Sequence, residues 1–140
     1  MYNPTRNQVR DFFYLSWERY CAGNPLSDLE RIAVEIISLH PEYQSLLEQR
    51  ERNFDRDFPP ESGDTNPFLH MSLHLSIAEQ LATDRPAGVR AELERLTAAR
   101  GDRHDALHDL LECLGETMWR AQRDGVSPDA AAYLDCLRGR

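Results

Sequence analysis

Residues 66–81 of this 140-residue chain have the sequence NPFLHMSLHLSIAEQL. Apolar side chains recur every three or four positions here, and this period predicts an α-helix that begins at Pro67 and ends near Thr83. His70 and His74 lie four residues apart, so both imidazoles fall on the apolar face of that helix. A buried polar group without a partner costs about 1 to 3 kcal/mol, so we expect both histidines to have partners in the fold.

The same periodicity predicts helices over most of the chain. They are expected from Pro4 to Tyr20, from Ser27 to the break at His40-Pro41, around residues 43–47, and over residues 67–83, 86–100, 103–123 and 128–137. Ser27 is the expected N-cap of the second helix, and Gly101 and Gly125 are expected to close two later ones. Because no strand-like alternation occurs, the sequence predicts an all-α, single-domain helical bundle of about six or seven helices spanning residues 1–140.

The stretch 51–65, ERNFDRDFPPESGDT, has no apolar period and contains Pro59-Pro60. It is therefore expected to be a long loop, and long loops in compact domains are usually functional or mobile. Phe54 and Phe58 are the side chains expected to attach this loop to the core.

The charge pattern excludes several classes of function. The formal net charge is −8, and the sequence shows no basic stripe, so neither nucleic acid nor a membrane is an expected partner. All 16 basic residues are arginine, which excludes a Schiff-base lysine and a phosphate-loop lysine. Arg50, Arg52 and Arg56 alternate with acidic residues, as in a solvated mixed patch. Nothing in the sequence brings arginines together into a pocket for a small acidic metabolite.

The three cysteines are Cys21, Cys113 and Cys136. Their odd number, wide spacing and lack of a C-x-x-C motif indicate neither a disulfide framework nor a structural zinc site. No role is expected for Cys113. The N-terminus has no apolar signal core and no apolar stretch is long enough to cross a bilayer, so we expect a cytoplasmic protein in a reducing compartment.

A second histidine pair lies in the stretch GDRHDALHDLLECLGETMWRAQR, residues 101–123. His104 and His108 repeat the four-residue spacing, and Glu112 extends it by one turn, so three potential ligands line one edge of the helix. The short connections near residues 84 and 102 are typical of antiparallel neighbours. The helices that carry the two histidine pairs should then be parallel, with both pairs in their first turns and therefore at the same end of the bundle.

This arrangement predicts a metal site formed by His70, His74, His104, His108 and Glu112. Imidazole and carboxylate ligands without a thiolate suit one transition metal ion: zinc, iron, manganese or nickel. His40, directly before Pro41, is expected to be a turn residue and not a further ligand. The sequence identifies no reaction; in an enzyme, the ion would activate a water or bind dioxygen, with Glu112 as a ligand or general base.

The alternative is a non-catalytic interaction protein. In this hypothesis the buried histidines form a structural hydrogen-bond network, and the charged loop 51–65 engages a protein partner or a second copy of the chain. The two hypotheses differ in whether the histidines bind metal.

Several long strings in the chain resemble a known family. They are YNPTRNQVRDFF at residues 2–13, HPEY at 40–43, NPFLHMSLHLSIAEQ at 66–80, ECLGETMWRAQR at 112–123 and YLDCL at 133–137. The chain resembles, from end to end, an uncharacterised family of small bacterial proteins, domain-of-unknown-function family 1841. The resemblance implies no activity, ligand or catalytic residue.

Overall fold

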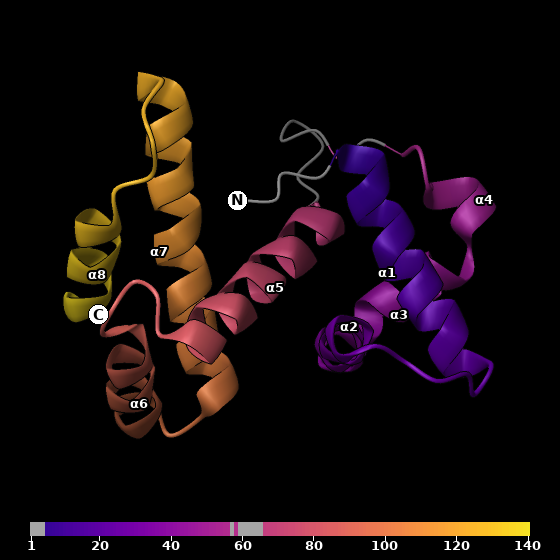
Figure 1. The fold of residues 1–140 in the computed structure, drawn as a ribbon, viewed down its shortest axis with the longest axis horizontal. Helices are drawn as coiled ribbons and strands as arrows, with labels where there is room; N and C mark the ends of the chain where they lie inside the picture. Colours follow the sequence, from indigo (N-terminus) through magenta and orange to yellow (C-terminus); the bar gives the residue numbers. More distant parts are fainter. Residues whose placement is uncertain (1–4, 57, 59–65) are drawn as a thin grey trace. The chain divides into compact units, whose positions relative to one another are not determined.

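The computed structural model describes residues 5–56, 58 and 66–140, and within these ranges all regular structure is helical (Figure 1). The expected all-α class is confirmed. In chain order the elements are α1 (Arg6–Cys21), α2 (Asp28–Ser38), the 3₁₀-helix η1 (Pro41–Tyr43), α3 (Gln44–Glu48), α4 (Arg50–Asn53), α5 (Pro67–Thr83), α6 (Val89–Arg100), α7 (Arg103–Asp124) and α8 (Ala130–Arg138). Among the described residues, no helix combines the length and the apolar character that crossing a bilayer requires.

Three helices begin two or three residues after Pro4, Pro86 and Pro128, the positions at which the sequence predicts their starts. Helix α1 begins after Thr5, which forms a capping box with Gln8, and α8 begins after Asp129, whose side chain accepts a hydrogen bond from the amide of Ala132. Helix α6 begins after Gly88, which has a φ of 102°. In α1 and α8 the polar cap satisfies free backbone amides of the first turn, so the caps set the starts of these two helices.

Two compact units make up the chain, Met1–Leu75 and Ser76–Arg140, and the boundary between them falls within α5. The expectation of a single domain stays a prediction.

The core of the first unit lies where α1 packs against α2 and receives the first turns of α5. Phe13, Ile37 and Met71 are completely buried in it. Phe54 and Phe58 pack against this core, so the expectation that they attach the segment after residue 50 is confirmed. The segment is not a loop throughout, because its beginning forms α4; residues 57 and 59–65 of the expected loop lie outside the described residues.

Helix α1 also holds the chain that follows α4. Arg10 is 3% exposed, and its guanidinium donates hydrogen bonds of 2.7 Å to the carbonyls of Phe54 and Arg56. Arg6 donates to the carbonyls of Asp55 and Arg56. These carbonyl oxygens therefore accept hydrogen bonds from arginine side chains, and the bonds hold the chain after α4 against α1.

In the second unit α7 packs against α6 and α8. Cys113 on α7 and Cys136 on α8 form a disulfide, with their Cα atoms 5.8 Å apart. The expectation of no disulfide is therefore wrong. Helix packing brings together two cysteines that are 23 residues apart, a proximity that their sequence spacing does not reveal. The disulfide also removes the ground on which a reducing compartment was expected.

Candidate metal centre

The first two histidines of the site lie in the opening turns of α5. Asn66 starts the helix, because its side-chain oxygen accepts hydrogen bonds from the amides of Phe68 and Leu69. Four residues of helix then place the rings of His70 and His74 side by side, with centroids 4.9 Å apart. His74 is 5% exposed and His70 is partly buried, so both belong to the inward face, as predicted.

A third histidine, His40, belongs to the same cluster. It follows α2, directly before η1, and is 4% exposed. Its Nδ1 lies 2.7 Å from the carbonyl oxygen of Ile36, which is one of the last carbonyls of α2. The interpretation of His40 as a turn residue describes its backbone correctly and misses its side chain. A histidine that follows an apolar helix turn and precedes proline was the available signal.

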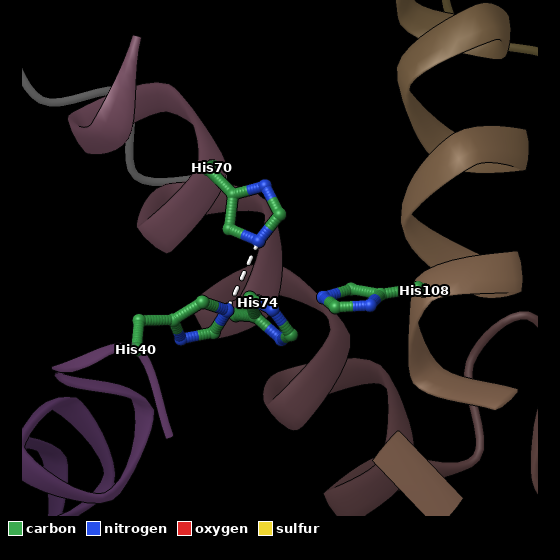
Figure 2. A group of neighbouring side chains, drawn as sticks. All are labelled: His40, His70, His74 and His108. Atoms are coloured by element: carbon green, nitrogen blue, oxygen red, sulfur yellow. Dashed lines mark hydrogen bonds between the residues drawn. The ribbon is translucent and has the colours of Figure 1, made fainter. Parts of the chain in front are cut away.

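The three rings face one another within the first unit (Figure 2). Nε2 of His40 lies 3.1 Å from Nε2 of His70, and the ring centroid of His40 lies 4.8 Å from that of His74. The potential ligand atoms of the three residues all lie within 4.8 Å of one another. We call His40, His70 and His74 the histidine triad. His108, also drawn in Figure 2, belongs to the second unit and is described with it below.

The hydrogen bond to Ile36 determines where His40 carries its proton. A carbonyl oxygen only accepts, so the proton of a neutral His40 ring is on Nδ1, and Nε2 presents a lone pair toward His70. A histidine that ligates a metal usually donates its other ring N–H to a carbonyl or carboxylate in this way. His40 thus has both the tautomer and the orientation of a metal ligand.

The distance between His40 and His70 fits two chemical states. Two imidazole nitrogens bound to one ion at about 2.0–2.1 Å lie about 2.8–3.4 Å apart, for octahedral to tetrahedral angles. The observed 3.1 Å also fits a hydrogen bond in which Nε2–H of His70 donates to Nε2 of His40. To bind an ion there, His70 has to move that proton to Nδ1 or release it.

Tyr43 completes the surroundings of the triad. Its ring stacks on His40, with centroids 5.3 Å apart and planes 10° from parallel, and meets His70 edge-on at 6.0 Å. Burial raises the pKa of the Tyr43 hydroxyl, and the neighbouring Glu42 carboxylate raises it further. The Tyr43 hydroxyl is therefore neutral at physiological pH. Because its ring stacks on His40, Tyr43 also restricts the rotation of the His40 ring.

The other predicted ligands lie on α7 in the second unit. Asp102 caps α7, and the rings of His104 and His108 pack with centroids 4.3 Å apart. Glu112 is exposed, and its carboxylate accepts a hydrogen bond from the guanidinium of Arg140. The predicted convergence of this pair with His70 and His74 concerns two separate units and stays a prediction.

Comparison with known proteins gives one result. A family described as a domain of unknown function, DUF1841, matches residues 5–139, which is nearly the whole chain. No curated protein and no solved structure matches. The comparison carries neither a ligand nor a reaction, so the function has to be argued from the site.

Proposed function

The chain belongs to the DUF1841 family of unknown function, and we propose from the geometry of the histidine triad that it binds a transition metal ion. The observation that carries the proposal is the pair of Nε2 atoms of His40 and His70, 3.1 Å apart, with Nδ1 of His40 bound to the carbonyl of Ile36. This combination supplies a lone pair of fixed direction next to a second imidazole at the separation that a shared ion requires.

His74 is the third proposed ligand. Its ring lies 4.8 Å from the ring of His40 and 4.9 Å from the ring of His70, and its side chain is buried like that of His40. Three ligands from two segments, the end of α2 and the start of α5, hold an ion more firmly than a pair on one helix, because the protein fixes both segments before the ion binds.

The ligands from the second unit stay in the proposal on sequence grounds alone. His104 and His108 are the stronger candidates, because they repeat the four-residue spacing of His70 and His74. Glu112 is the weakest candidate, because Arg140 already occupies its carboxylate at 2.5 Å. Replacing each residue separately tests its contribution.

An imidazole donor set selects among ions. Neutral imidazole suits zinc, iron, nickel and copper, whereas manganese prefers carboxylate, carbonyl and water oxygens. We therefore favour zinc or ferrous iron. Three protein ligands leave a position for water on a four-coordinate ion, and the ion could then act as a Lewis acid. Binding is the proposed function, and a reaction would be an addition to it.

Elemental analysis tests the proposal on the full-length chain, purified without a histidine tag or chelator and then reconstituted with zinc or ferrous iron. We expect about one equivalent of metal, lost in His70→Gln and in His40→Gln. Cys21→Ser is the matched control, because Cys21 is the exposed free cysteine and thus an adventitious ligand; this variant should keep its metal. Wild-type protein that stays without metal after both reconstitutions would refute the proposal.

One observation favours the alternative, a structural hydrogen-bond network. The 3.1 Å contact between His40 and His70 is a normal hydrogen bond once His70 carries its proton on Nε2. In this case glutamine at position 70, which can still donate, leaves the stability near that of the wild type. Urea unfolding of metal-free wild type and His70→Gln distinguishes the two functions when it is combined with the metal content.

A further inference from the structure

The first unit carries a polar cleft that no histidine lines. It has a volume of about 330 Å³, at the small end of the range of ligand pockets. It lies along η1, α3, α4 and the residues that follow α4. Its lining is Glu42, Ser45, Leu46, Gln49, Arg52, Asn53 and Arg56.

Asn53 is the buried polar residue of this cleft. It is 5% exposed, and its Nδ2 donates hydrogen bonds of 3.2 Å to the carbonyls of Leu46 and Gln49. These two bonds fix the amide plane and use both amide hydrogens. No described residue donates to Oδ1 of Asn53, so this oxygen is an oriented acceptor without a partner in a cleft that the residue lines.

The rim of the cleft carries charges of both signs. Arg52 and Arg56 supply two guanidinium groups, and Glu42 supplies one carboxylate. Neither Arg52 nor Glu42 forms an ion pair with a described residue. Arg56 is held, because its guanidinium lies over the Phe58 ring at 4.9 Å and its carbonyl accepts from Arg10. In the sequence these arginines form only a mixed patch; the turns between η1 and α4 bring them to one cleft with Glu42 and Asn53.

We propose that this cleft binds an α-amino acid, and we take glutamate as the probe. The α-carboxylate of such a ligand matches the guanidinium of Arg52, which prefers planar oxygen acceptors. Its ammonium group matches the carboxylate of Glu42 and the oriented oxygen of Asn53, which both accept only. A zwitterionic ligand thus complements one positive group, one negative group and one oriented acceptor.

The proposal is tested by an NMR titration of the ¹⁵N-labelled, full-length protein with L-glutamate, in the absence of metal. We expect saturable shifts of the Asn53 side-chain amide and of the backbone amides of Ser45 and Gln49. Glutarate lacks the ammonium group and should bind about tenfold more weakly, which corresponds to one charge-assisted hydrogen bond.

Two variants test which part of the ligand each charged side chain binds. Arg52→Gln should weaken glutamate and glutarate alike, whereas Glu42→Gln should weaken glutamate about tenfold and leave glutarate unchanged. Arg31→Gln, an exposed arginine on α2, is the matched control and should bind as the wild type does. All three side chains are exposed, so the fold should persist.

Three results would overturn the proposal. The first is the absence of shifts at these residues with millimolar glutamate. The second is equal binding of glutarate or inorganic phosphate, which would show a site for anions in general. The third is unchanged glutamate binding in Arg52→Gln. The metal site is not involved in any of these outcomes, so the two proposals fail or hold separately.

Discussion

Arg10 is a buried cation that serves the fold of the first unit. Its guanidinium donates to two carbonyls at 2.7 Å and lies over the Phe68 ring at 4.6 Å. Substitution of Arg10 by methionine keeps an unbranched, flexible side chain but leaves those carbonyls without this donor. We expect a loss of about 2–4 kcal/mol in the free energy of unfolding, measured by urea denaturation.

Arg31→Met is the matched control for this prediction. Arg31 is exposed and its ion pair with Asp28 spans 3.8 Å, so its replacement should change the stability by less than about 0.5 kcal/mol. An equally small effect of Arg10→Met would show that the chain after α4 is held by other contacts.

Tyr133 makes the stability sensitive to alkaline pH. Its hydroxyl donates a 2.8 Å hydrogen bond to Oε1 of Gln80, and burial raises its pKa above the ordinary value of 10.0. The folded state therefore keeps a proton that the unfolded chain loses above about pH 10. The contribution of Tyr133 to the free energy of unfolding is complete below the pKa that its hydroxyl has in the unfolded chain. This contribution is lost as the pH rises toward the pKa of the hydroxyl in the folded state.

We therefore expect the free energy of unfolding to fall steeply above pH 10. Tyr133→Phe should reduce that slope by about 1.4 kcal/mol per pH unit, which is the effect of one proton. Tyr14 and Tyr43 also have raised pKa values through burial, so part of the slope remains in the variant. Urea denaturation between pH 8 and about pH 11.5 measures this difference. Parallel curves for the two proteins would contradict the prediction.

At the scale of elements, the disulfide joins α7 to α8. Helix α8 already packs through Tyr133 and Leu137, which are buried, so the disulfide adds to an existing contact. The disulfide joins residues 23 positions apart. A bond that closes a loop of this length stabilises the fold by about 3 kcal/mol, mainly because it lowers the conformational entropy of the unfolded chain. Cys136→Ser should therefore lower the free energy of unfolding by about that amount and keep the helical content.

The chemistry of the thiols checks this prediction directly. Oxidised wild type should present one reactive thiol per chain, that of Cys21, and three after reduction and unfolding. Cys21→Ser serves as the control, with stability close to the wild type. Three reactive thiols in the native, oxidised protein would show that the cysteine pair is not bonded in solution.

At the scale of the whole molecule, the question is whether a metal ion in the triad engages both units. An ion that binds only the folded state stabilises it by about 2.7 kcal/mol at a hundredfold excess over its dissociation constant. The histidine spacing in the sequence predicts that His108 is a ligand, so His108→Gln should weaken metal affinity by at least about tenfold. Competition with a chelator of known affinity measures this, with Glu116→Gln on the same helix as the control. An unchanged affinity would confine the site to the first unit.

The sequence by itself determined what depends on neighbours within a few positions. The helical class, the N-cap at Ser27, and the glycine ends at Gly101 and Gly125 were all predicted and are observed. The placement of His70 and His74 on an inward face also followed from a period of 3.6 residues. These features need only local hydrogen bonding and periodicity, which the order of residues contains.

Only the tertiary structure decided which distant residues meet. His40 lies 30 positions from His70, and Cys113 lies 23 positions from Cys136, yet each pair is in contact. The cleft around Asn53 likewise depends on how η1, α3 and α4 turn on one another. Such contacts arise from the packing of helix faces, which depends on the shapes of many side chains at once. For this reason spacing predicted the faces of the helices correctly and missed the partners on those faces.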